Sequence, residues 1–212
     1  VSHDLRGPLR AMSGFSQALE EDFGPQLPPA AHEYLHHIQA GSQQMGELID
    51  GLLKLSRATR GEVQHEPVDV SELTRRVVQK LKAAEPQREV ALRCDANLTV
   101  KGDAKLLELV LTNLLGNAWK YTAKTERPEI QVSGEVTDAE VSIHIADNGA
   151  GFDSKHAAKL FQPFQRLHRE DEFPGLGIGL ATVRRILRRH GGDIRATGAP
   201  GKGATFSFSL PT

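Results

Sequence analysis

The sequence predicts an α+β protein, built as an N-terminal helical hairpin followed by a mixed α/β domain. Three observations indicate this class. Apolar residues recur at helical spacing through the first sixty residues, whereas from Val68 onward short alternating stretches typical of strands are interleaved with helical ones. Between the two parts lies the short polar stretch 63–67. We therefore expect two domains, residues 1–62 and 68–212, joined by a hinge at 63–67.

The N-terminal part contains two amphipathic helices joined by a turn. The first helix has its apolar stripe, with spacings of four and three, at Leu5, Leu9, Met12, Phe15 or Ser16, and Leu19. Residues 24–29 read Gly-Pro-Gln-Leu-Pro-Pro and end this helix, because proline lacks an amide donor and clashes with the preceding turn. The second helix has a four-three repeat typical of a bundle seam at Ala31, Leu35, Ile38, Ser42, Met45, Ile49, Leu52 and Ser56.

The two helices of one hairpin share a single interface, which is too small to bury all of their apolar residues. Further apolar residues flank the seam, namely Leu19, Phe23, Leu48, Leu53 and Leu55. A second copy that completes a four-helix bundle would bury them, so we expect a homodimer. The alternative is that the hairpin packs against the rest of the same chain.

In the second part, expected helices and strands alternate. A helix begins at Asp69 or Ser71, and either residue is suited to cap it. We then expect strands at 90–94 and 98–100, a helix at 103–121, adjacent antiparallel strands at 130–135 and 140–147, a helix at 177–190, and strands at 193–195 and 205–210. A turn falls near 137–138. The long stretch between Gly151 and Gly175 has no such pattern, and we interpret it as a lid over a ligand.

Composition narrows the partners and the compartment. The formal net charge is −1 at pH 7, which gives no reason to expect binding to nucleic acid or to an acidic membrane surface. No apolar run approaches the roughly 20 residues that span a bilayer, so we expect no membrane contact by this segment. Cys94 is the single cysteine, which excludes an internal disulfide and favours a reducing, cytoplasmic location.

Two asparagines on the expected helix 103–121 are candidate metal ligands. Asn113 and Asn117 are four residues apart and therefore project from one helix face. Amide oxygens are acceptable ligands for Mg²⁺, which completes its shell with phosphates and waters. Lys120, one turn beyond Asn117, adds a positive charge toward phosphate. Taken alone, such a pair is more often an ordinary polar helix face.

A carboxylate and two sets of glycines complete a candidate nucleotide site. Asp147 ends a strand, is followed by Gly149 and Gly151, and is suited to accept a hydrogen bond from an exocyclic amine such as that of adenine. The alternative is a plain turn, since Asp-Asn-Gly is a strong turn signal. Further on, the glycines of 175–179 stand at a helix N-terminus, where free amides and the helix dipole favour phosphate.

In their order along the chain these motifs resemble those of the sensor histidine kinases. The motifs are His3-Asp4-Leu5-Arg6-Gly7-Pro8-Leu9, Asn113-Leu-Leu-Gly-Asn117-Ala118, Asp147-Asn-Gly149-Ala-Gly151 and Gly175-Leu-Gly177-Ile-Gly179. Residues 1–62 are similar to the kinases' dimerisation and phosphoacceptor domain. Residues 68–212 are similar to the α/β sandwich ATP-binding domain shared by DNA gyrase, MutL and histidine kinases. Residues 1–6, 164–169 and 175–192 look most like kinases of the phytochrome type.

The resemblance implies a role for each site residue, with ATP and Mg²⁺ as ligands. It makes Asn117 the principal Mg²⁺ ligand, with Asn113 close to the metal and phosphates. At the adenine end it implies that Asp147 reads the base, that Tyr121 packs along it and that Thr205 bonds it through water, while Gly149 and Gly151 shape the pocket. At the phosphate end it implies that Arg166 reaches the γ-phosphate. The other residues that it places against phosphates are Lys120, Gly175, Gly177 and Gly179. His3 is the phosphorylated residue and Asp4 its general base.

The pairing of His3 with Asp4 makes chemical sense. A neutral imidazole, with an ordinary pKa of about 6.5, is a usable nucleophile at pH 7. An adjacent carboxylate holds the reactive tautomer and receives its proton. Without an ATP site, His3 would be read as a surface histidine.

Two competing classes remain open at this point. One is an ATP hydrolase or ATP-driven clamp of the gyrase or MutL kind, in which the first position of the asparagine motif is typically a glutamate that activates water. Asn113 lacks that basicity. The other is a degenerate kinase that dimerises and holds nucleotide without transfer.

The resemblance also implies partners. They are a second copy of the chain, the receiver domain of a response regulator, and an upstream sensor module. We expect the sensor module to be absent from this chain, because the chain begins two residues before His3. Many kinases of the family have Thr or Asn four residues after the acceptor histidine, where it orients a water against the regulator's phosphoaspartate. This chain has Gly7 there, so we expect weak phosphatase activity.

Overall fold

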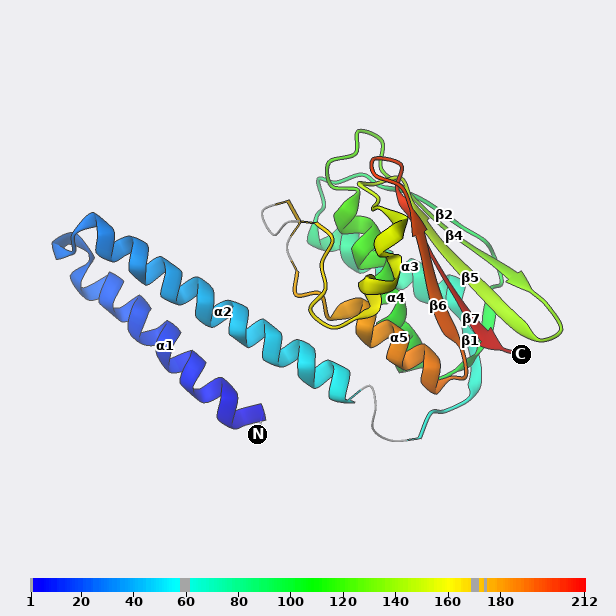
Figure 1. The fold of residues 1–212 in the computed structure, drawn as a ribbon, viewed down its shortest axis with the longest axis horizontal. Helices are drawn as coiled ribbons and strands as arrows, with labels where there is room; N and C mark the ends of the chain where they lie inside the picture. Colours follow the sequence, from blue (N-terminus) through cyan, green and yellow to red (C-terminus); the bar gives the residue numbers. More distant parts are fainter. Residues whose placement is uncertain (1, 58–61, 169–171, 174) are drawn as a thin grey trace. The chain divides into compact units, whose positions relative to one another are not determined.

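The computed structural model describes residues 2–57, 62–168, 172–173 and 175–212, with the backbone alone at 2–6, 47 and 54–57. The chain divides into two compact units, residues 1–57 and 58–212. The first is helical and the second contains a mixed sheet with helices, which confirms the predicted α+β class (Figure 1).

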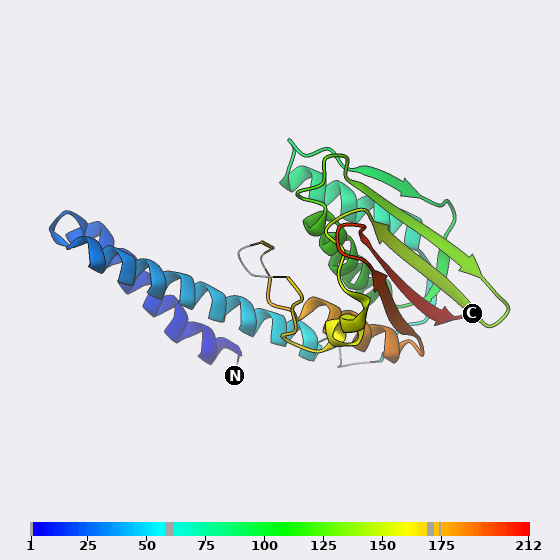
Figure 2. The same ribbon diagram turned by 45° about the horizontal axis from the view of Figure 1, so that its top comes forward.

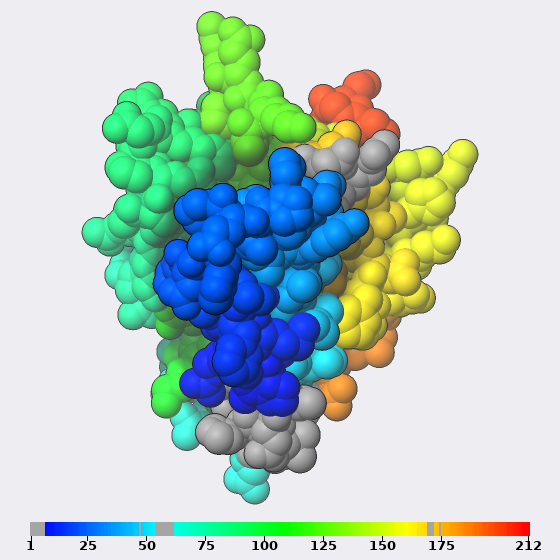
Figure 3. All heavy atoms as spheres, turned by 90° about the vertical axis from the view of Figure 1, so that its left-hand side faces the viewer, coloured from blue at the N-terminus to red at the C-terminus, as the bar shows by residue number. Residues whose placement is uncertain are grey.

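The helical unit is a hairpin. Helix α1 (Ser2–Phe23) and helix α2 (Pro29–Arg57) are joined by the 3-10 turn η1 (Gly24–Gln26) and lie side by side, as the space-filling view of the turn end also shows (Figure 3). Ser16, Leu35 and Ser42 are buried in this unit. Large apolar side chains with more than two fifths of their surface exposed are Met12, Phe15, Leu19, Phe23, Tyr34, Ile38, Met45 and Leu52. Packing of α1 on α2 thus leaves much of the predicted apolar seam uncovered.

The second unit is a two-layer sandwich. A five-stranded sheet has the order β2-β4-β5-β7-β6, and helices α3, α4 and α5 cover one of its faces (Figures 1 and 2). Its elements are α3 (Val70–Ala84), β2 (Ala91–Cys94), α4 (Ala104–Tyr121), β4 (Glu129–Val136), β5 (Glu140–Asp147), η2 (Ser154–Phe161), α5 (Gly179–Arg189), β6 (Asp193–Gly198) and β7 (Ala204–Pro211). A two-stranded sheet pairs β1 (Glu66–Asp69) with β3 (Thr99–Gly102).

The core of this unit lies between the sheet and α4. Along β7 every second side chain is buried, as expected for a strand with one covered face. These residues belong to the same core cluster as the apolar face of α4, on which Leu111, Leu114 and Leu115 are almost fully buried. Burial of each such side chain contributes about 1.5–3 kcal/mol, so α4 is held firmly and can carry polar site residues on its remaining face.

The caps agree with the sequence for the most part. Asp69 caps α3 by accepting a hydrogen bond from the Glu72 amide at 2.9 Å, while Ser71, the alternative cap, bonds Asp95 and Leu98 instead. Strands β4 and β5 pair antiparallel, with the turn closed by a hydrogen bond from the Thr137 amide to the Glu140 carbonyl.

Three local features differ from the expectation. Glu66 and Pro67, which we expected in the hinge, belong to strand β1 and pair with Gly102 and Lys101. This strand is too short to show alternation, and its second residue is a proline, which is uncommon within strands. The expected structureless lid contains the 3-10 helix η2, capped by Asp153. Helix α5 begins at Gly179 rather than Gly177, because Gly177 has φ of +71°, which an α-helix does not accommodate.

Candidate active site

Helix α4 presents its polar face to the start of α5. Asp103 caps α4 by accepting hydrogen bonds from the amides of Lys105 and Leu106. Ten residues on, the side-chain amide of Asn113 donates to the Leu109 carbonyl at 2.7 Å, which leaves Oδ1 free to face outward. An ideal Cβ at Gly179 would lie 2.5 Å from that oxygen. Asn113 and the first residue of α5 are therefore in immediate proximity.

Asn117 and Lys120 follow on α4 and are both half-buried. Burial, with a further contribution from the charge of Arg166, lowers the pKa of Lys120 to about 8. The Lys120 ammonium lies 4.3 Å from the centroid of the Tyr121 ring and 3.4 Å from the position of a Cβ at Gly175. The structure thus brings the cations at 120 and 166 together beside the glycine segment.

Asp147 stands at the end of β5, half-buried beside the end of α4. Burial raises the pKa of its carboxyl group, and hydrogen bonds from the backbone amides of Gly149 and Ala204 oppose that effect. The Gly149 amide lies 2.9 Å from Oδ1. A carboxylate has about four acceptor positions, so these two donors leave capacity for a ligand amine.

The loop after Asp147 is built around glycine. A Cβ at Gly149 would overlap the Tyr121 carbonyl, and one at Gly151, where φ is +62°, would overlap the Ala199 carbonyl. The Ala150 amide donates to the Tyr121 carbonyl at 3.0 Å. This loop is therefore fixed against the C-terminal end of α4, which places Asp147 beside Tyr121.

The segment 175–179 leads into the N-terminus of α5. Its N-cap residue, Ile178, has no polar side chain to bond the first amides of the helix. The positive dipole end of α5 thus faces the polar face of α4, the arrangement that favours phosphate.

Some expected site residues are not brought to this place. Thr205 pairs with Ala146 in the ladder between β5 and β7, whereas Asp147 pairs with Ala204. Because successive side chains alternate between faces, Thr205 projects to the sheet face opposite Asp147. The side chains of His3 and Asp4 lie outside the described residues, although both positions belong to helix α1.

Three contributors were missed by the reasoning from sequence. The Ala204 amide bonds Asp147, a contact that follows from strand register and has no side-chain signal. Phe173 and His168 pack on Tyr121, with ring centroids 5.0 and 5.1 Å away. The aromatic residues of the lid were the available signal for this contact.

Family models match both parts of the chain. Residues 1–61 match the His Kinase A (phospho-acceptor) domain. Residues 102–212 match the histidine kinase-, DNA gyrase B- and HSP90-like ATPase family. The ATPase family alone leaves gyrase-like proteins open, but the phosphoacceptor match in front of it excludes them. The chain belongs to the sensor histidine kinases.

Curated relatives of this histidine kinase core span its whole length. The phytochrome-like protein Cph1 of Synechocystis is 31% identical over 211 residues, covering 100% of this chain and 28% of that protein. The adaptive-response sensory kinase SasA of Thermosynechococcus vestitus is 32% identical over 221 residues, covering 100% of this chain and 58% of that protein. The chain thus spans less than two thirds of the length of these relatives.

A solved structure supports the same assignment. Full-length ShkA in complex with AMPPNP has a TM-score of 0.69 and 28% identity, covering 99% of this chain and 44% of that one. The ATPase family match and this nucleotide-bound neighbour support ATP binding by the second unit of the kinase core. None of the helices in the described parts of the chain could span a lipid bilayer.

Proposed function

We propose that the chain transfers the γ-phosphoryl group of ATP to His3 and then to an aspartate on the receiver domain of a response regulator. The observation that carries this proposal is the convergence of Asn113, Lys120 and Asp147 with the N-terminus of α5, in a chain whose first 61 residues match a phosphoacceptor domain. A nucleotide site and an acceptor histidine are the two components that the reaction requires.

In this proposal adenine binds at the Asp147 end of the site. The carboxylate accepts a hydrogen bond from the 6-amino group, and the Tyr121 ring packs along the base. The triphosphate extends toward the glycine segment, where Lys120, Arg166 and the amides of α5 meet its charge. Thr205 is left out, because its strand register directs it to the other face of the sheet.

Mg²⁺ would be held by Asn117, with Asn113 beside it. The residues fit the ion, because the Asn113 amide group donates to Leu109 and so directs its oxygen toward Gly179, where the phosphates enter. Two amide oxygens leave coordination positions for phosphate and water, as Mg²⁺ prefers. When bound, the ion neutralises the charge on the transferring phosphoryl group.

The transfer itself needs a nucleophile and a base. A neutral His3 nitrogen forms the bond to the γ-phosphorus while the bond from that phosphorus to the β,γ-bridging oxygen breaks, and ADP leaves. Asp4 accepts the imidazole proton. Water is a poor competitor, since Asn113 stands where a hydrolase would need a carboxylate base.

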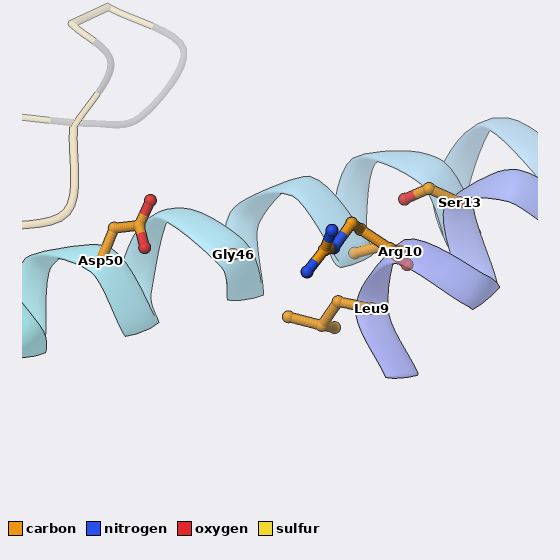
Figure 4. A pocket seen from close by; sticks show the side chains of 6 residues that line it. Leu9, Arg10, Ser13, Gly46 and Asp50 are labelled. Carbon is orange, nitrogen blue, oxygen red and sulfur yellow. The ribbon is translucent and has the colours of Figure 1, made fainter. Parts of the chain in front are cut away.

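The proposed core is a homodimer. The exposed apolar residues of the hairpin recur at spacings of three, four and seven, so they form stripes that a second hairpin can cover. A groove of about 220 Å³ between α1 and α2 is lined by Leu9, Arg10, Ser13, Ser42, Gly46 and Asp50 (Figure 4). Small residues on both helices open this groove, and side chains of the second copy would fill it.

Three further parts of the proposal rest on the family. They are the response regulator as phosphate acceptor, a sensor module carried by the rest of a longer protein, and a cytoplasmic site of action. Support for the second is that the relatives are much longer than this chain.

The deciding experiment is labelling with γ-labelled ATP and Mg²⁺. We expect label on the protein that is labile in acid and stable in base, as phosphohistidine is. His3→Gln should abolish labelling and leave nucleotide binding intact, whereas Asn117→Ala should weaken Mg²⁺-dependent ATP binding and labelling together. His36→Gln, an exposed histidine in α2, is the matched control and should label normally. Persistent label on His3→Gln would refute the assignment of the acceptor.

A further inference from the structure

The inference concerns His168, a half-buried histidine in the segment between η2 and α5. Its Nε2 atom lies 2.8 Å from the Gly151 carbonyl oxygen. Because a carbonyl only accepts, Nε2 carries the proton and donates it. His168 is therefore tied by a hydrogen bond to the loop that follows Asp147.

The same imidazole is part of an aromatic cluster of three rings. His168 lies 5.1 Å from Tyr121 and 5.2 Å from Phe173, and Tyr121 and Phe173 are 5.0 Å apart, all measured between ring centroids. Such separations fall in the range where aromatic pairs attract each other beyond simple burial. Phe173 is only 6% exposed, so the cluster is closed on that side.

Further contacts make this arrangement stiff on the Gly151 side. The Gly201 amide donates to the Ala150 carbonyl at 2.7 Å, and the Ala150 amide donates to Tyr121. On the other side, the Arg166 guanidinium donates to the Phe173 carbonyl at 2.8 Å. His168 thus connects a rigid loop, the end of α4 and the segment that carries Arg166.

We propose that His168 is a positioning residue of the nucleotide site, which holds residues 165–168 and 172–173 against Tyr121 and thereby sets how long adenine nucleotide stays bound. The proposal deepens the proposed function, because it rests on Tyr121 and Asp147 forming the adenine end of that site. His168 itself takes no part in phosphoryl transfer. It acts through Tyr121, Phe173 and the Gly151 loop.

Two substitutions at His168 separate the contribution of its hydrogen bond from that of its ring packing. His168→Phe keeps an aromatic ring and removes the hydrogen bond, whereas His168→Gln keeps a donor at a similar reach and removes the ring. His156, an exposed histidine in η2, gives the matched controls His156→Phe and His156→Gln. The readouts are the dissociation rate of fluorescent mant-ADP from the full chain, and KM for ATP and kcat of autophosphorylation.

We expect both His168 variants to release mant-ADP at least about threefold faster and to raise KM for ATP, with kcat at saturating ATP nearly unchanged. His168→Ala should release it faster than either. The His156 variants should behave like wild type. Unchanged release by both His168 variants would overturn the proposal, as would a parallel fall of kcat and thermal stability with no change in KM. If wild type itself bound no mant-ADP, the proposed function would fail instead.

Discussion

Asn113 and Gly179 face each other so closely that no side chain fits between them. An ideal Cβ at Gly179 would lie 2.5 Å from Asn113 Oδ1, a separation that real Cβ atoms do not adopt. The two residues are 66 positions apart in sequence, and their proximity joins the polar face of α4 to the start of α5. Glycine at the start of α5 thus allows the close approach of the oxygen that we assign to the metal and phosphate end of the site.

Gly179→Ala should therefore displace the Asn113 side chain or the first turn of α5. We expect ATP affinity measured with Mg²⁺ to fall by about tenfold or more, the equivalent of about 1.4 kcal/mol. Titration calorimetry with MgATP measures it. Gly116→Ala is the control, since a Cβ at that α4 position meets nothing within 4 Å. Wild-type affinity in Gly179→Ala would contradict the assignment of this contact to the site.

Asp147→Asn tests the reading of adenine. The carboxylate accepts hydrogen bonds from Gly149 and Ala204 and, in our proposal, from the 6-amino group. A hydrogen bond to a charged group contributes about 1.5–3 kcal/mol, so ATP affinity should fall roughly 10- to 100-fold. Purine riboside triphosphate, which lacks the 6-amino group, should lose far less. Equal losses for the two nucleotides would reject adenine readout by this residue.

Lys120 should make ATP binding depend on pH. Its pKa in the free protein is lowered to about 8 by burial and by Arg166. Bound triphosphate favours the charged lysine and raises this pKa, so binding above pH 8 takes up a proton. Affinity should therefore be insensitive to this group below pH 8 and should fall above it, by up to about tenfold per pH unit.

Calorimetry at pH 7 and pH 9, in two buffers that differ in ionisation enthalpy, measures this proton uptake. Adenosine, which has no phosphate, is the ligand control and should bind equally at both values. In Lys120→Gln the dependence should disappear. A slope unchanged by that substitution would place the titrating group elsewhere.

Phe15 provides a test of the homodimer. Its side chain is 73% exposed in the single hairpin. Val136, at the end of strand β4 in the other unit, is also 73% exposed and serves as the control. Loss of one buried phenylalanine costs about 1.5–3 kcal/mol, so Phe15→Glu should weaken dimerisation by at least about tenfold. Val136→Glu should not. Sedimentation velocity over a concentration series gives the dissociation constants, and equal constants for both variants would argue against this face as the interface.

Gly7 leads to the prediction of weak phosphatase activity. Glycine has no hydroxyl or amide to orient water, and a Cβ at this position meets nothing within 4 Å, so Gly7→Thr should be tolerated in α1. Release of inorganic phosphate from the phosphorylated regulator, with ADP present, should be slow in wild type and at least about tenfold faster in Gly7→Thr. Gly14→Thr has the same open surroundings and should match wild type. Rapid release by wild type, with no gain in Gly7→Thr, would exclude the role of this position.

The sequence by itself determined most of the elements of the chain and predicted its chemistry. Regular apolar spacing predicted both hairpin helices and α4, because burial of one face imposes a period that is visible residue by residue. The motifs at Asn113 to Asn117, at Asp147 and at the glycines before α5 predicted a nucleotide site, because metal, amine and phosphate each need a particular kind of group. The resemblance of residues 1–62 to a phosphoacceptor domain agrees with the family match over residues 1–61.

Tertiary structure alone decided which of these groups meet. Strand register pairs Asp147 with Ala204 and turns Thr205 to the opposite face, and sequence carries no mark of register when both neighbours are small or polar. The approach of Gly179 to Asn113 and the cluster of Tyr121, His168 and Phe173 depend on how the segment before α5 folds back on α4. Strand β1 escaped notice because four residues are too few to show alternation and because one of them, Pro67, is disfavoured in strands.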